Sequence, residues 1–279
     1  MSFWQSVLAF LDSSMETPPS FGWFHLMWVA ITFLALIPLL CFPKQQSQDH
    51  VRRVVMTTAI AVIILEIYKQ INYSFSYEDG ITFDYQWYAF PFQFCSTPMY
   101  IGLLAGLIKK GKLHESLCAY LATYAVFAGT AVMIYPNDAF IGTVGINIQT
   151  MICHGSMITI GIYLYATGHV KLQHKTILKA MPVFAVTVSM AAVMNEIAYR
   201  AGLLETETFN MFFISPYCDP SLLIYKDVQA VVPFPWSLVI YILGFTAAAY
   251  LILLIAMGIG KLVGKLKAPP RGEAVTVGD

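Results

Sequence analysis

Two side chains in this 279-residue sequence could together perform nucleophilic catalysis, namely Cys95 and His154. A thiol attacks an ester well only after it loses its proton, and histidine is the most common base for that step near neutral pH. We therefore interpret Cys95 as a candidate nucleophile, and His154 as the base that would take and return its proton. The alternatives are a thiol packed in the core, a structural histidine, and a disulfide between Cys95 and Cys153.

Other polar residues fall within apolar stretches at a similar predicted depth, where they would face the interior of a helix bundle. Glu66, Lys69 and Gln70 are three and four residues apart, so a helix would place them on one face. We expect Glu66 and Lys69 to form an internal ion pair, and the same spacing rule pairs Glu196 with Arg200. One of the two glutamates would orient the histidine base.

These polar residues define a predicted substrate pocket in the outer third of the membrane. Its members are Gln93, Glu66, Lys69, Gln70, Gln149, Asn195 and Glu196. The side-chain amide of Gln93, Gln149 or Asn195 would donate a hydrogen bond to the oxyanion. The inner halves of the apolar runs are almost purely apolar, which argues against a path for conducting ions or protons.

Two prolines, Pro91 and Pro98, flank Cys95 closely. A proline within a helix removes a backbone hydrogen bond and bends the helix axis. We therefore predict a distorted, kinked helix that presents Cys95, with neighbouring hydroxyl groups satisfying the freed carbonyls.

The elements that position these residues follow from composition. Hydrophobic residues make up 58% of the chain and charged residues only 11%, whereas a soluble domain carries about 25% charged residues. The formal net charge is zero and the mean hydropathy is +0.66. This composition excludes a soluble enzyme, a disordered chain and an ordinary nucleic-acid binder, and indicates a membrane protein whose partners are lipids. The five cysteines show no zinc-binding spacing, so we expect no metal and no soluble cofactor.

The chain contains seven apolar runs that are long enough to cross a bilayer. They lie at 21–42, 54–72, 89–108, 116–135, 149–167, 177–198 and 233–259. Lysine and arginine gather in alternate connecting segments, which places those segments in the cytoplasm. We expect an integral protein of a bacterial plasma membrane, with the N-terminus outside and the C-terminus cytoplasmic.

The predicted fold is an all-α bundle of seven membrane-spanning helices with a short N-terminal helix lying on the outer leaflet. The predicted organisation is an interfacial helix and linker at 1–20, one membrane domain at 21–260, and a basic, then disordered, cytoplasmic tail at 261–279.

Three segments also resemble motifs of a known family. Residues 90–96 resemble the signature L-P-[FL]-x-L-C of bacterial YwaF-like integral membrane proteins, which in turn resemble the eukaryotic transmembrane protein 164 family. The stretch from His154 and Gly155 to Tyr163 and Gly168 is similar to the second motif. The third motif is matched by Asn210-Met211-Phe212-Phe213 through Pro216, by Ser221-Leu222-Leu223 and by Pro233-Phe234-Pro235-Trp236.

The resemblance implies acyl chemistry on lipids. The eukaryotic relatives are described as acyltransferases that move fatty acyl chains between phospholipids, and a more distant group of similar fold hydrolyses fatty-acid esters. In this family the residue matching Cys95 is the proposed acyl-carrying nucleophile and the one matching His154 is its partner. The alternatives are a transporter or binding protein that uses the same pocket for a lipid or small polar ligand, and a structural subunit of a larger complex.

Overall fold

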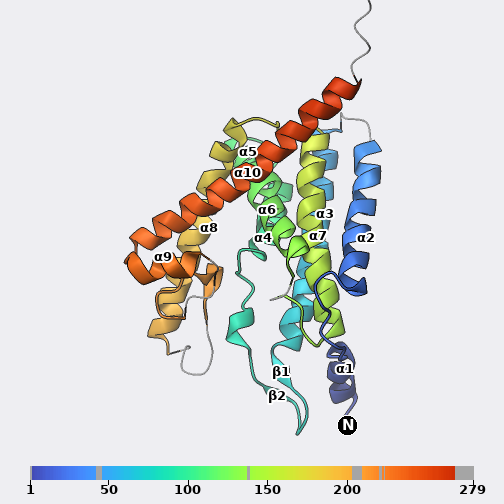
Figure 1. The fold of residues 1–279 in the computed structure, drawn as a ribbon. Coiled ribbons are helices and arrows are strands. Elements are labelled where there is room, and N and C mark those ends of the chain that lie inside the picture. Colours follow the sequence, from blue (N-terminus) through green and yellow to red (C-terminus); the bar gives the residue numbers. More distant parts are fainter. Residues whose placement is uncertain are drawn as a thin grey trace, which may run out of the picture.

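The computed structural model describes residues 2–41, 46–136, 139–202, 209–219, 222 and 224–267. Helices dominate it (Figure 1). The α-helices are α1 (Phe3–Leu11), α2 (Trp23–Cys41), α3 (Gln48–Asn72), α4 (Thr97–Leu107), α5 (Lys112–Tyr120), α6 (Val126–Ile134), α7 (Val144–Ala166), α8 (Lys175–Arg200), α9 (Tyr225–Val231) and α10 (Trp236–Lys267). The last of these runs obliquely across the bundle and continues beyond the predicted end of its span. The predicted tail from residue 268 onwards lies outside the described residues.

Four helical stretches are long and apolar enough to cross a membrane by length and composition, so the chain is an integral membrane protein. They are Gln48–Asn72, Lys112–Ile134, Lys175–Arg200 and Trp236–Leu262. The prediction of seven spans is confirmed for these four only. The first and third predicted spans form shorter apolar helices, Trp23–Pro38 and Thr97–Leu107. The fifth corresponds to α7, which is long, but its polar side chains dilute its hydropathy.

The all-α prediction needs one correction, because a small antiparallel hairpin follows α3. Its strands are β1 (Phe75–Ser76) and β2 (Thr82–Phe83), and Phe75 pairs with Phe83. A 3₁₀ turn, η1 (Trp87–Ala89), leads from the hairpin towards α4. Figure 1 places α1 beside this hairpin at one end of the molecule, which we call the hairpin end.

The predicted N-terminal helix is confirmed as α1, and it is fastened to the hairpin end by Asp12. This carboxylate accepts hydrogen bonds from Asn72, Tyr77 and Thr143. The backbone of Ser14 also forms a β-bridge with that of Thr143. The connection to α3 and to the segment before α7 therefore fixes the direction in which α1 leaves the bundle.

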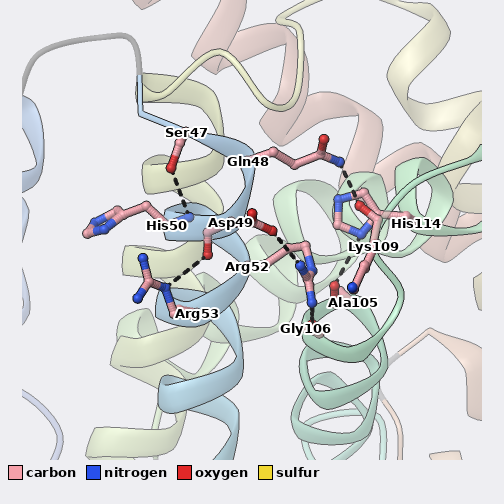
Figure 2. A network of polar contacts seen from close by, with 10 residues as sticks. All are labelled: Ser47, Gln48, Asp49, His50, Arg52, Arg53, Ala105, Gly106, Lys109 and His114. Atoms are coloured by element: carbon pink, nitrogen blue, oxygen red, sulfur yellow. Dashed lines mark hydrogen bonds and ion pairs between the residues drawn. The ribbon is translucent and has the colours of Figure 1, made fainter.

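The opposite, basic end of the bundle caps the C-terminus of α4 (Figure 2). The last carbonyls of a helix have no intrahelical donor, so other groups must supply one. Arg52 on α3 donates two hydrogen bonds to the carbonyl of Gly106, at 3.1 and 2.8 Å, and the His114 ring lies 3.1 Å from the carbonyl of Ala105. Positive charge at this end also complements the helix dipole. These contacts fix α4 against α3 and α5.

Close packing against small residues positions α7 between its neighbours. A β-carbon at Gly129 on α6 would lie 2.6 Å from the carbonyl oxygen of His154, and one at Gly155 would lie 2.6 Å from the hydroxyl oxygen of Thr32 on α2. Only glycine permits these approaches. Between α5 and α6 the chain widens into a π-helical turn, η2 (Leu121–Ala125), which also packs on α7.

Candidate functional site

Cys95 lies in a tight turn immediately before α4. The backbone N–H groups of Ser96 and Thr97 both donate to the carbonyl of Gln93, at 2.9 and 3.1 Å, which closes the turn around the cysteine. The predicted kinked helix is therefore wrong at this point, because α4 begins only at Thr97. Pro98 occupies the first turn of α4, where the N–H that it lacks has no intrahelical acceptor.

The Cys95 thiol is free, half-buried and placed at the N-terminus of α4. The start of a helix carries partial positive charge, which favours an anion such as a thiolate. The Cys153 Sγ on α7 lies 3.8 Å from the carbonyl oxygen of Cys95, and both thiols are free. The two cysteines are therefore neighbours without a disulfide, and α7 packs directly against the turn that holds Cys95.

His154 is buried on α7 with only 6% of its surface exposed. Its Nδ1 lies 2.7 Å from the carbonyl oxygen of Thr150. A carbonyl can only accept a hydrogen bond, so Nδ1 carries the proton and the neutral ring keeps a lone pair on Nε2. Within the described residues Nε2 has no hydrogen-bond partner. A backbone carbonyl, rather than Glu66 or Glu196, thus orients the ring and leaves a free basic nitrogen.

The two predicted catalytic residues lie in the same layer but face different neighbours. Consecutive side chains on a helix point about 100° apart. Since Cys153 faces the Cys95 turn, His154 points more towards α6, whose Gly129 packs on the His154 backbone. In the part of the chain that the structure describes, no hydrogen bond joins the Cys95 thiol to His154.

Glu66 is the centre of a buried polar network, and its predicted ion pair with Lys69 is confirmed. The Lys69 Nζ lies 2.9 Å from Glu66 Oε1, and Gln70 donates to the same oxygen at 2.8 Å. Gln149 on α7 donates to Glu66 Oε2 at 3.1 Å. Four of the seven predicted pocket residues therefore meet, because the α3 face that carries three of them packs against α7.

The network continues to the segment that leads to Cys95. The Gln70 amide also donates to the carbonyl of Ala89 at 2.9 Å, and its oxygen accepts a 2.6 Å hydrogen bond from the Tyr85 hydroxyl. Burial, together with the nearby Glu66 carboxylate, raises the pKa of Tyr85 to about 12. The phenol therefore stays protonated at neutral pH and continues to donate.

The buried network also adjoins the candidate catalytic pair. Gln70 binds the carbonyl of Ala89 in the segment before Cys95, and Gln149 lies on the helix that carries His154. The Lys69–Glu66 pair is therefore a shared neighbour of the elements that hold both residues, which spacing along α3 alone did not reveal.

Gln93 and Asn195, by contrast, both bind the backbone of one distant segment. Gln93 Nε2 donates to the carbonyl of Asn210 at 3.0 Å, and its Oε1 accepts from the N–H of Phe212 at 2.9 Å. Asn195 Oδ1 and Nδ2 bond the N–H and carbonyl of Met211, at 2.7 and 3.0 Å. We call residues 210–213 the clamped segment. One N–H of each amide is thus committed to the backbone rather than aimed at a substrate.

The clamped segment has a strained backbone conformation that reasoning from the sequence missed. Phe212 and Phe213 adopt left-handed backbone angles, with φ of 59° and 57°, which side chains larger than glycine rarely adopt. Met211 and Phe212 are fully buried. The two amides supply the hydrogen bonds that offset the strained backbone, and a run of aromatic residues gave no signal of it.

Glu196 lies next to Asn195 near the end of α8, apart from the Glu66 network. It forms the predicted pair with Arg200 at 2.6 Å and accepts a hydrogen bond from the Tyr217 hydroxyl. The hydrogen bond and the carboxylate charge raise the pKa of Tyr217. The half-exposed Glu196 carboxylate therefore belongs to the end of α8 rather than to the Glu66 network.

A groove between α3 and α4 reaches the buried network from the outside of the bundle. Its walls are mainly apolar and its polar lining comes from Glu66, Gln70 and Ser74. Lining residues include Ile63, Ile67, Met99 and Tyr100. Met99 also lines a second, internal cavity next to Cys153 and Ser156. Apolar walls around a few polar groups suit a lipid chain that ends in an ester.

The described residues contain no group of three or more His, Cys, Asp or Glu side chains able to hold a metal ion. Comparison with protein families matches the chain to the TMEM164 family over residues 20–257, which is most of the chain. No curated protein and no solved structure matches the chain.

Proposed function

The chain belongs to the TMEM164 family, and from this premise we propose that it is an integral-membrane enzyme that transfers or hydrolyses fatty acyl esters of lipids. The observation that carries the proposal is a free thiol in the turn before α4. The backbone of this turn packs against the helix that holds His154, whose buried Nε2 has no hydrogen-bond partner among the described residues. The adjoining groove supplies apolar walls for an acyl chain. Cys95 and His154 together support a mechanism in which the thiol is the nucleophile.

In the proposed reaction, the Nε2 lone pair of His154 takes the proton from the Cys95 thiol. The thiolate attacks the ester carbonyl carbon and forms a C–S bond, and the C–O bond to the glycerol oxygen breaks. The leaving oxygen receives the proton from His154, and the acyl group remains on Cys95 as a thioester. A second alcohol or water then attacks the thioester and restores the thiol, which completes transfer or hydrolysis.

Proton transfer needs a closer approach than the structure contains. Catalytic hydrogen bonds in enzymes without substrate are often long and tighten when the substrate binds. The thiol sits in an irregular turn, whereas His154 sits on a tightly packed helix. Substrate binding in the α3–α4 groove would therefore act on the Cys95 turn.

The test is intact-protein mass spectrometry after incubation with mixed phospholipids. We expect an acyl adduct that hydroxylamine removes, that maps to Cys95 and that is lost in Cys95→Ala and His154→Ala. Cys218→Ser is the matched control, because Cys218 is also a free, half-buried thiol, and it should retain the adduct. A Cys95→Ala protein with full lipid turnover would refute the mechanism.

A second candidate is a non-enzymatic binding protein or transporter. The observation that favours it is the assembled network of Glu66, Lys69, Gln70 and Gln149 beside a groove, next to a cysteine and a histidine that are not hydrogen-bonded to each other. Saturable ligand binding that survives Cys95→Ala but is lost in Glu66→Gln would support this candidate over the enzyme.

A further inference from the structure

The ion pair between Lys69 and Glu66 is buried close to Cys95 and has no evident need to be there for stability. The Glu66 side chain is 6% exposed and that of Lys69 is 17% exposed. Removing two charges from water costs about as much as their attraction returns, so a buried pair contributes little net stability. Its position in the same layer as the candidate nucleophile points to a chemical role.

We propose that Lys69 is a positioning residue whose ammonium stabilises the thiolate of Cys95, and that Glu66 holds this ammonium in place. The inference rests on the proposed function and names a further residue of the same site. No additional bond is made or broken, since the lysine acts through its charge while the proton of Cys95 still passes to His154.

The contacts of Glu66 explain how the ammonium is held. Both carboxylate oxygens are occupied, Oε1 by Lys69 and Gln70 and Oε2 by Gln149. Two amides from different helices therefore fix the carboxylate, and the carboxylate fixes the lysine. Among the described residues Lys69 Nζ has Glu66 as its hydrogen-bonding or ion-pair partner, and an ammonium has three N–H groups. The charge retains donors that can face a thiolate.

The site also connects this pair to Cys95 through packing. Gln149 lies one helical turn before Cys153 on α7, so both face α3 and α4, and the Cys153 Sγ touches the carbonyl of Cys95. Gln70, the neighbour of Lys69 on α3, also donates to the carbonyl of Ala89 in the segment that leads to Cys95. The positive end of α4 adds to the field of the ammonium.

Other titratable groups lie on the elements that pack around the Cys95 turn, and they must be counted in any pH experiment. They are Glu66 on α3, Tyr100 on α4, Tyr120 on α5, and Cys153 and His154 on α7.

The experiment measures the rate at which neutral iodoacetamide alkylates Cys95 between pH 6 and 10 by peptide mass spectrometry, in protein reconstituted in lipid. In Lys69→Met we expect the rate at neutral pH to fall about tenfold and the profile to move to higher pH, because a thiolate loses a neighbouring cation. Lys69→Arg keeps the charge and should restore most of the rate. A Lys69→Met profile that superimposes on the wild-type profile would overturn the inference.

Two further variants separate charge from folding. The double variant Lys69→Met with Glu66→Gln removes both charges, so no lone buried charge remains to unfold the protein, and it should also alkylate slowly. Lys179→Met is the matched control, because it removes the cation of the exposed Lys179–Glu115 pair, which lies on α5 and α8 rather than beside Cys95. It should alkylate like the wild type.

The outcomes also separate this inference from the proposed function. Slower alkylation of Cys95 in Lys69→Met, without any acyl adduct on Cys95 in the wild type, would support the role of the lysine charge and refute acyl transfer. An acyl adduct together with an unchanged profile in Lys69→Met would overturn the role of the lysine and leave acyl transfer standing.

Discussion

Replacing Asn195 with alanine should release the clamped segment. The substitution removes a 2.7 Å hydrogen bond from the Met211 N–H and a 3.0 Å hydrogen bond to the Met211 carbonyl. Met211 is fully buried and Asn195 is 1% exposed, so water cannot easily replace the lost partners. Each unpaired buried backbone group costs about 1–3 kcal/mol, although interhelical hydrogen bonds in membranes average less, at about 0.6 kcal/mol.

We therefore expect Asn195→Ala to lower the unfolding free energy by about 3 kcal/mol, measured by denaturant titration of tryptophan fluorescence in detergent. Gln48→Ala is the control, since it removes one exposed amide hydrogen bond to the carbonyl of Lys109 and should cost less than about 1 kcal/mol.

The alkylation rate of Cys218 provides a second measurement. The Cys218 Sγ lies 3.6 Å from the carbonyl oxygen of Phe209, just before the clamped segment. Alkylation of Cys218 should accelerate in Asn195→Ala and stay unchanged in Gln48→Ala. Equal unfolding free energies in the two variants would refute the idea that the amide holds this backbone.

Three other changes test the packing and the hairpin end. Gly155→Val places a β-carbon 2.6 Å from the Thr32 hydroxyl oxygen and should lower the thermal midpoint by several degrees, whereas Gly244→Ala, with nothing within 4 Å, should not. Asp12→Ala removes the acceptor that fastens α1, so limited proteolysis should cleave the N-terminal segment faster than in the wild type. The pKa of Tyr85 rises from 10.0 in the unfolded chain to about 12 in the folded protein. Its contribution to stability is therefore complete below pH 10 and is lost as the pH rises to about 12. In Tyr85→Phe, the unfolding free energy should fall less steeply over that pH range.

Local spacing predicted those contacts that lie within one helix. Glu66 with Lys69 and Glu196 with Arg200 are three and four residues apart, and both form as expected because the helix geometry alone brings them together. The meeting of Glu66 with Gln149 also depends on which helices pack side by side, and only the shared predicted depth hinted at it. The predicted depth of a residue in the membrane was therefore informative. The direction in which its side chain points around the helix axis was not predicted.

The start of α4 shows why a local pattern can mislead. Pro98 is compatible with a kink inside a helix and with the first turn of a new one, because the residue lacks an N–H in both cases. Tertiary contacts determine that the helix begins at Thr97. They include the hydrogen bond from Tyr100 to the carbonyl of Pro91 and the hydrogen bonds between Gln93 and the clamped segment. A partner more than a hundred residues away in sequence leaves no trace in the local pattern.

The same contacts decide which part of the site can move. Close packing at Gly129 and Gly155, where a β-carbon would lie 2.6 Å from an atom of the neighbouring helix, holds α7 between α2 and α6 and resists a rotation that would turn His154 towards Cys95. The Cys95 turn contains no such close-packed glycine and ends a segment without regular helix. Because Gln93 closes that turn and also binds the clamped segment, a shift of residues 210–213 would be transmitted to the thiol. We therefore expect a change in the clamped segment to affect the proposed proton transfer.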